Sequence, residues 1–370
     1  MKNRWEVGSQ FDWSNDMVML SAAKTLLPES YELFSTGTAC LFSMATLLQQ
    51  HQIHRLRLHI PSFLCMHFVA KLKTVFDVCW YRDLPTQESP DFNTLNTLPG
   101  DLVLAVNLFG IRQGKVWQDW LFQHDDIILI EDHTHDPFSS WAQQSTAHYA
   151  IASLRKTLPI PDGGIIWSPQ NMKLPKASSS KSQAADKRLT AMLLKRAYLS
   201  GANISKDIFR QLEIESEEEF DDETNCVAST FTSVILSCLN IAKFRQLRET
   251  NIRHFLNWSL TEKHPNWMPL FSSWPISSVP FNSVIVCQSQ DIRDNLRKYL
   301  IAQNIFPAIH WLQTTPDKSS NDPLAIELSN RILTIPTDQR YSLDDIARVA
   351  AKITDFFKQS GKLTYSLIGK

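Results

Sequence analysis

The chain lacks the cysteine spacing of a disulfide framework or of a zinc site. Six cysteines are scattered over 370 residues without a C-x-x-C pair: Cys40, Cys65, Cys79, Cys226, Cys238 and Cys287. A disulfide framework needs regularly spaced cysteines, and a zinc site needs cysteines, or cysteines and histidines, at short spacing. The sequence therefore indicates neither, and a reducing, cytoplasmic environment is the expectation.

An excess of charge of one sign is also missing, and so is any long apolar run. Lys and Arg number 37 against 38 Asp and Glu, a formal net charge of −1, so we expect no nucleic-acid partner. The first residues lack the apolar core of a signal peptide. No run approaches the roughly 18 apolar residues of a spanning helix, so we expect no membrane partner.

What the chain does have is apolar content of 43% over 370 residues, enough for a large core and two domains. Residues 31–168 alternate strand-like and helix-like segments, with buried strands expected at 101–109 and 126–131 and a buried helix at 38–50. This alternation predicts an α/β fold whose mostly parallel sheet is flanked by helices. Functional residues should gather at the carboxyl ends of its strands.

The later part of the chain predicts a second, smaller unit. From residue 284 onward strand-like and helix-like segments alternate again. A long helical pattern at 229–256, either one helix or two joined, connects the two parts. We expect a large domain at 1–245 and a small C-terminal α/β domain at 246–370. Within the large domain, the pattern predicts a surface loop at 173–188, a helix at 186–212 and a solvated, mobile acidic segment at 215–223.

Lys156 is the most informative single residue. It lies in an apolar stretch that ends in Gly163-Gly164 and a strand-like run. A lysine in apolar surroundings loses its proton more easily, which makes it a nucleophile able to form a Schiff base. Alone, such a residue is most often a surface lysine.

Asp132 follows the apolar run Ile127–Ile130 and Glu131. Its carboxylate either caps a loop at a strand end or pairs with a pyridinium nitrogen, so that the ring can accept electrons. His133, His135 and Asp136 follow closely and suggest a metal site. Ligands this close along a tight turn do not reach tetrahedral positions without strain, so we expect no metal.

Residues Ser35 to Ala39 precede the expected buried helix. Thr36 or Thr38 can cap that helix, and Gly37 permits close backbone approach. Free N–H groups and the helix dipole make such an end a phosphate site. An ordinary N-cap explains the same residues without any ligand.

In this order, these segments resemble the DegT/StrS-type sugar aminotransferases, which are fold type I enzymes dependent on pyridoxal phosphate (PLP). The resemblance spans about residues 30–355. It rests on the segments 36–39, 60–62, 107–110, 130–135, 153–164, 248–251, 304–311 and 332–341.

The resemblance implies roles for individual residues. Lys156 would bind PLP covalently and carry a proton, and Asp132 would pair with the ring nitrogen. His135 would lie near the 3-hydroxyl, and His310 on the substrate side. The phosphate would be held by Gly37, Thr38, Ala39 and Ser153, and by Asn225 across the interface of a homodimer.

The sequence also departs from that family, which indicates a divergent branch. Cys65 stands where an aromatic residue often stacks on the ring, a role that Phe63, His67 or Phe68 can take instead. Ile151 replaces a phosphate-binding serine, and Val227 replaces an arginine. Ten glycines are few for this fold.

Three functions remain open on the sequence alone. The first is transamination from an amino-acid donor to a keto group, by resemblance that of a nucleotide-linked sugar. The second is other PLP chemistry, such as dehydration or a carbon–carbon bond reaction, because a fold fixes the cofactor better than the reaction. The third is a non-catalytic protein, against which Lys156 and Asp132 argue.

Overall fold

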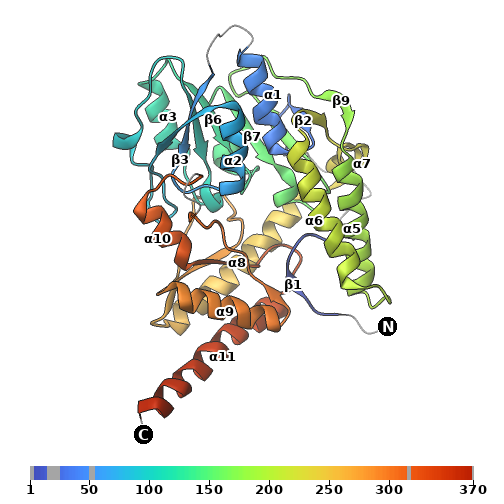
Figure 1. The fold of residues 1–370 in the computed structure, drawn as a ribbon, viewed down its shortest axis with the longest axis vertical. Helices are drawn as coiled ribbons and strands as arrows, with labels where there is room; N and C mark the ends of the chain where they lie inside the picture. The colour runs from blue at the N-terminus through green and yellow to red at the C-terminus, as the bar shows by residue number, and fades with distance from the viewer. Residues whose placement is uncertain (1–3, 15–25, 50–54, 315–317, 369–370) are drawn as a thin grey trace.

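A nine-stranded sheet forms the larger part of the fold. The computed structural model describes residues 4–14, 26–49, 55–314 and 318–368. The strand order is β4-β3-β5-β6-β7-β8-β2-β10-β9, and Figure 1 shows helices on both sides of this sheet. The pairs from β4 to β7 are parallel, whereas β8 and β2 run antiparallel to their neighbours. The expected α/β fold with a mostly parallel sheet is confirmed.

The strands of the large sheet are short. Their bounds are β2 Glu32–Phe34, β3 Arg57–Pro61, β4 Asp77–Tyr81, β5 Leu102–Val106, β6 Ile128–Asp132, β7 Tyr149–Ser153, β8 Gly164–Trp167, β9 Ser178–Lys181 and β10 Cys226–Val227.

Strand β5 shows how the apolar pattern sets the layers. Leu102, Leu104 and Val106 join the core beneath α1 (Gly37–Gln49) and α2 (Met66–Val75), whereas Val103 and Ala105 join the core beneath α3 (Lys115–Phe122). Side chains alternate across a strand, so a continuous apolar run fits a strand that is covered on both faces.

The C-terminal part is built on a three-stranded antiparallel sheet. Its order is β11-β12-β14, with bounds β11 Trp267–Pro269, β12 Ser283–Cys287 and β14 Ile332–Ile335. The helices of this part are α8 Ile241–Glu262, α9 Gln290–Ala302, α10 Pro323–Arg331 and α11 Leu343–Ile368. The expected boundary at residue 245 falls inside α8, and the division at that residue stays a prediction.

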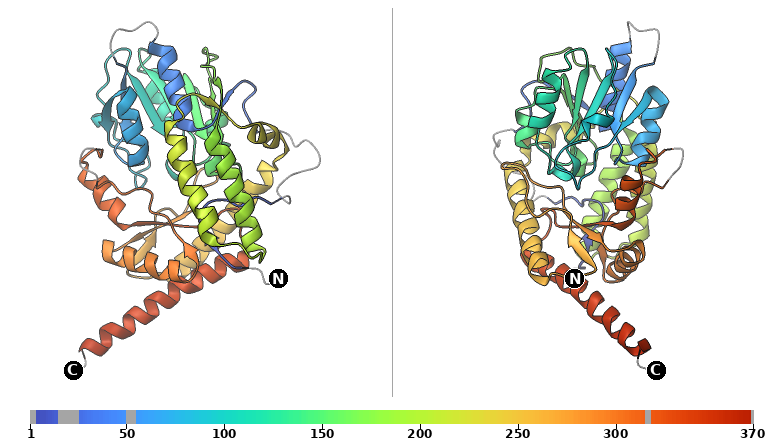
Figure 2. Two further views of the ribbon diagram at one scale, coloured as in Figure 1. Left: turned by 45° about the vertical axis from the view of Figure 1, so that its right-hand side comes forward. Right: turned by 90° about the vertical axis from the view of Figure 1, so that its left-hand side faces the viewer.

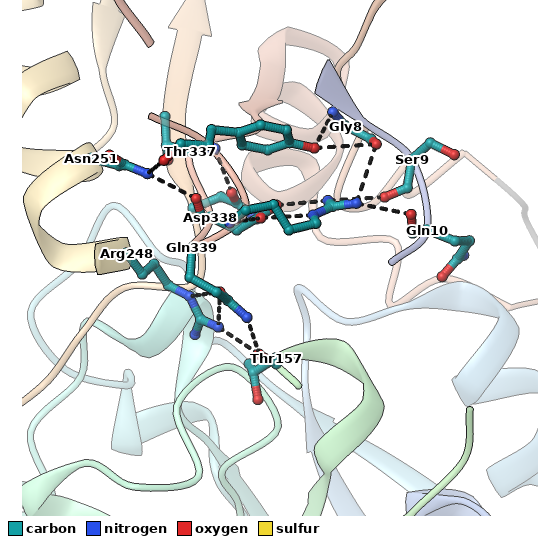
Figure 3. Close-up of polar contacts among 12 residues, drawn as sticks. Gly8, Ser9, Gln10, Thr157, Arg248, Asn251, Thr337, Asp338 and Gln339 are labelled. Carbon is teal, nitrogen blue, oxygen red and sulfur yellow. Dashed lines mark hydrogen bonds and ion pairs between the residues drawn. The ribbon is translucent and has the colours of Figure 1, made fainter. Parts of the chain in front are cut away.

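The N-terminal segment lies against this C-terminal part. Strand β1 (Val7–Gly8) pairs in parallel with β13 (Ile305–Phe306). The guanidinium of Arg340 donates hydrogen bonds to the carbonyl oxygens of Ser9 and Gln10 at 3.2 and 2.9 Å (Figure 3). These contacts hold residues 7–10 against the C-terminal part.

Three expectations for residues 173–223 are wrong. Strand β9 and the start of α5 (Gln183–Leu199) replace the expected loop, and the expected helix at 186–212 is two helices. The break lies at 200–205, where Gly201 takes a φ of 94° and Ser205 caps α6 (Lys206–Asp222). The acidic segment is the second half of α6 rather than a mobile region, because Phe220 is buried and several carboxylates pair with cations.

Helix α11 projects beyond the rest of the fold in both views of Figure 2. Among the residues that the structure describes, no helix is both long enough and apolar enough to cross a membrane.

Candidate active site

A cavity of about 220 Å³ lies at the carboxyl ends of β5, β6 and β7. Its wall brings together predicted site residues from five separate segments, namely Gly37, Thr38, Cys65, Asp132, His135, Ser153, Lys156 and His310. We call this space the inner cavity. It continues into a more open space of about 700 Å³, the outer chamber, and both are lined by Lys156 and His310.

Asp132 ends strand β6 with its side chain turned to the inner cavity. One carboxylate oxygen accepts a hydrogen bond of 2.8 Å from the N–H of Thr134. The side chain of Thr134 also forms a hydrogen bond with this carboxylate. Burial raises the pKa of the Asp132 carboxyl, and the hydrogen bonds from Thr134 oppose the shift. A buried carboxylate that lines the cavity is suited to accept a hydrogen bond from a proton-bearing ligand nitrogen.

Lys156 ends a single turn of 3-10 helix (Leu154–Lys156) that follows β7. Its side chain faces the cleft and stays open to solvent. The charge of Arg155, and then partial desolvation of the amine by the cleft wall, lower the pKa of the Lys156 amine to about 8. A larger fraction of the amine is therefore neutral and nucleophilic near neutral pH than in an ordinary lysine.

Arg155 belongs to an ion cluster that the sequence did not predict. Its guanidinium donates two hydrogen bonds to the carboxylate of Glu217 on α6, at 2.8 and 2.9 Å, and Arg188 of α5 pairs with the same carboxylate at 2.8 Å. Burial opposes ionisation of Glu217, but the charges of Arg155, Lys156 and Arg188 outweigh it and hold the pKa of Glu217 well below its usual range. The only sequence signal was the high density of charge in α6.

His135 lies in a stack of aromatic rings at the inner cavity. The planes of Phe281 and Trp311 are tilted from its ring by 23° and 14°, with centroids 4.8 and 5.4 Å away. Burial, followed by the charges of His310 and Lys156, lowers the pKa of His135 to about 3. Its Nδ1 accepts the N–H of Phe109 at 2.8 Å, which leaves Nε2 as the N–H donor of a neutral ring.

His310 closes the inner cavity from the C-terminal part. Its Nδ1 lies 2.9 Å from the hydroxyl of Thr334 on β14. Burial and the charge of Lys156 lower the pKa of His310 to about 4. Both histidines are therefore neutral at physiological pH and act as hydrogen-bonding groups rather than as cations.

The start of α1 faces the inner cavity across from Ser153. The hydroxyl of Thr36 accepts the N–H of Ala39 at 3.0 Å, so the expected N-cap is present and this amide is taken. The N–H groups of Gly37 and Thr38 donate to no described residue. A side-chain carbon at Gly164 would lie 2.0 Å from the carbonyl oxygen of Thr36, so the second glycine of the Gly163-Gly164 pair lets β8 approach the helix start.

Asn225 is the one predicted site residue that lies well apart from the inner cavity. It is exposed, on a separate surface groove shared with Thr46 and Lys176. The cap of the following helix α7 (Thr230–Ile235) is Ser229, whose hydroxyl accepts the N–H of Thr232 at 3.2 Å. Helix capping therefore does not account for Asn225.

The histidines and carboxylates at 131–136, which suggested a metal site, point in different directions. His133 pairs with Glu131 at 2.9 Å on the opposite face of the sheet, where both are fully buried. Asp136 pairs with Arg245 of α8, and His135 faces the inner cavity. In the part of the chain that the structure describes, no three such side chains converge on a common point.

The inner cavity fits pyridoxal phosphate in the kinds of group it offers. A nucleophilic amine, a buried carboxylate and two unused amides at the start of a 13-residue helix line one space. They correspond to the aldehyde, the ring nitrogen and the phosphate of that cofactor. Cys65 and Ile151 also line it, so the aromatic ring and the serine of the resembled family are absent at those positions.

Solved structures share this fold. A putative sugar aminotransferase, Spr1654 of Streptococcus pneumoniae, is 13% identical with a TM-score of 0.61, covering 90% of this chain and 88% of its own. PseC of Helicobacter pylori, an aminotransferase involved in the biosynthesis of pseudoaminic acid, is 11% identical with a TM-score of 0.61, covering 90% and 87%. The GDP-4-keto-6-deoxy-D-mannose-3-dehydratase of E. coli, solved with hydrated PLP, is 14% identical with a TM-score of 0.59, covering 94% and 100%.

These likenesses confirm the expected fold, that of PLP-dependent enzymes of fold type I. Identity at this level supports the fold alone, and the chemistry has to come from the site. No protein-family model and no curated protein matches the sequence.

Proposed function

We propose that this protein is a PLP-dependent aminotransferase. It would move an amino group from an amino-acid donor to a keto group of a nucleotide-linked sugar or a related small molecule. The observation that carries the proposal is the meeting of Lys156, Asp132 and the start of α1 in one cavity. The name of one structural neighbour, a putative sugar aminotransferase, supports a sugar as the acceptor.

The residues of the inner cavity have separate tasks in this proposal. Bound PLP supplies an aldehyde and a ring that accepts electrons. Lys156 is the amine that holds the cofactor and carries a proton on Nζ. Asp132 keeps a proton on the ring nitrogen, neutral His135 offers its Nε2–H, and the amides of Gly37 and Thr38 bind the phosphate.

The amino-donor half-reaction tests this function. The protein loaded with PLP is mixed with glutamate or glutamine, and the cofactor spectrum is recorded. We expect conversion to the pyridoxamine form without any keto acceptor. A set of common amino acids that leaves the spectrum unchanged contradicts transamination and favours the second candidate, other PLP chemistry, which the dehydratase fold neighbour supports.

We further propose a homodimer in which Asn225 completes the partner's phosphate site. In this chain Asn225 is exposed and apart from the inner cavity. Val227 stands where the resembled family has an arginine, so this position offers no cation to a phosphate. Loss of a hydrogen bond to a charged group costs about 1.5–3 kcal/mol, and we expect Asn225→Ala to weaken PLP retention by that amount.

Mixed dimers separate this proposal from a role within one subunit. One subunit carries Lys156→Ala and its partner carries Asn225→Ala. If Asn225 acts across the interface, both lesions fall in one site, and activity stays near half of the wild type. Loss of both sites, or a stable monomer in sedimentation at working concentration, contradicts the proposal.

A further inference from the structure

Arg248 is a buried cation on α8 that no carboxylate neutralises. Its side chain is 3% exposed. Nε and Nη2 donate to the amide oxygen of Gln339 at 3.0 and 2.6 Å, and Nη2 also donates to the carbonyl oxygen of Thr157 at 2.7 Å. Gln339 donates to the same carbonyl at 2.8 Å, so the three groups form a closed triangle (Figure 3).

The nearby carboxylates are committed to other cations. Asp338 pairs with Arg340 at 2.7 Å, and Asp136 pairs with Arg245. Among the described residues Arg248 has no ion pair, and its Nη1 has no hydrogen-bond acceptor. Buried charges in proteins are normally paired, because an isolated one is costly to take out of water. Burial lowers the pKa of the Arg248 guanidinium to about 10, and Asp338 and Asp136 offset part of that shift.

The guanidinium lines the outer chamber, which Lys156 also lines. Its contact with Thr157 places it one residue along the chain from Lys156. An anion bound to Nη1 would therefore occupy the chamber that the reactive lysine also lines. Four carboxylates of α6 line the same chamber and disfavour an anion of higher charge, those of Glu213, Glu217, Glu218 and Asp221.

We infer that Arg248 binds the α-carboxylate of the amino-acid donor and of the 2-oxo acid formed from it. The inference rests on the proposed function. In an α-amino acid the carboxylate is one carbon from the amino group, so a site for it must lie next to Lys156. A planar guanidinium already fixed on one side by Gln339 and Thr157 loses little entropy when it binds a carboxylate on the other.

Binding of an unreactive carboxylate to the cofactor-free protein gives a direct test. The probe is L-lactate, followed by ligand-observed NMR, and L-lactamide is the uncharged control. We expect the wild-type protein to bind lactate and not lactamide, and Arg248→Gln to bind lactate about 10- to 100-fold more weakly, the range for a lost charged hydrogen bond. Arg248→Lys keeps the charge and should restore part of the affinity.

Arg245→Gln is the matched control, three residues earlier on the same helix. Arg245 is already paired with Asp136 and does not line the outer chamber. We expect this variant to be less stable and to bind lactate as the wild type does. Equal loss of lactate binding in both variants indicates a general disturbance of α8 and overturns the inference. Failure of the wild-type protein to bind lactate overturns it as well.

Kinetics of the loaded enzyme separate this inference from the proposed function. We expect Arg248→Gln to raise the KM for the amino donor about 10- to 100-fold while the KM for the acceptor changes little. If donors convert the cofactor and their KM is unchanged in Arg248→Gln, the inference fails and the proposed function stands. If lactate binds through Arg248 but no amino acid converts the cofactor, the anion site stands and the proposed function fails.

UDP serves as a second binding probe. If Arg248→Gln loses binding of UDP and keeps binding of lactate, Arg248 belongs to a site for the acceptor diphosphate and the inference is overturned.

Discussion

Lys156→Ala is expected to abolish covalent attachment of PLP and to lower turnover by at least ~10³-fold, because one residue supplies both the nucleophile and the proton carrier. Borohydride reduction of the loaded wild-type protein, followed by peptide mapping, should mark Lys156. Lys71 provides a matched control, since it lines the same cavity but lies 4.0 Å from Asp221 in an ion pair. In Lys71→Ala the label should stay on Lys156.

The ion cluster beside Lys156 also predicts how the reaction of Lys156 with PLP depends on pH. The pKa of the Lys156 amine is lowered to about 8, so its reaction with PLP should rise with pH through that value. The charge of Arg155 is the main cause of the lowering, and the charge of Glu217 opposes it. Arg155→Gln should therefore move the midpoint to higher pH, and Glu217→Gln should move it to lower pH.

Stopped-flow absorbance of cofactor binding, recorded from pH 6.5 to about 10.5 to bracket the lowered and the ordinary lysine pKa, measures these midpoints. Shifts of the two variants in the same direction would show that the cluster acts by positioning rather than by charge. A label on another lysine rejects the assignment of Lys156 outright. PLP bound without any labelled lysine would favour a non-catalytic protein.

The features that the sequence predicted well depend on neighbours along the chain. The continuous apolar runs of β5 and of the strand before Asp132 are local patterns, and they indicate which strands are covered on both faces. The end of a buried parallel strand is also where function gathers, so Asp132 could be located without coordinates. The start of α1 was predictable in the same way, because its cap is contained in four consecutive residues.

The features that the sequence missed depend on partners far away in the chain. Glu217 meets Arg155 across 62 positions, and Arg248 meets Gln339 across 91. Without those partners, α6 reads as a repelling acidic run and Arg248 as one more charge on a surface helix. The placement of Asn225 depends on a second chain, and its role remains a prediction.

Asp132→Asn is expected to lower turnover by at least ~100-fold, or about 2.7 kcal/mol in activation free energy. An amide does not stabilise a proton on the ring nitrogen, so the ring loses its capacity to accept electrons. Folding should not suffer. The Asn oxygen still accepts the Thr134 N–H, and the wild-type pKa is raised, which means that the buried charge itself costs stability at neutral pH.

Asp136 supplies the matched control, four residues later and equally buried. Its carboxylate binds Arg245 and the N–H of Val279, away from the inner cavity. We expect Asp136→Asn to disturb that contact with α8 and to leave turnover close to wild type. Thermal unfolding of the cofactor-free proteins and steady-state rates of the loaded ones separate the two effects. An Asp132→Asn protein that folds, binds PLP and turns over normally would reduce Asp132 to a strand-end cap, because a carboxylate essential to the ring nitrogen cannot be replaced by its amide without loss.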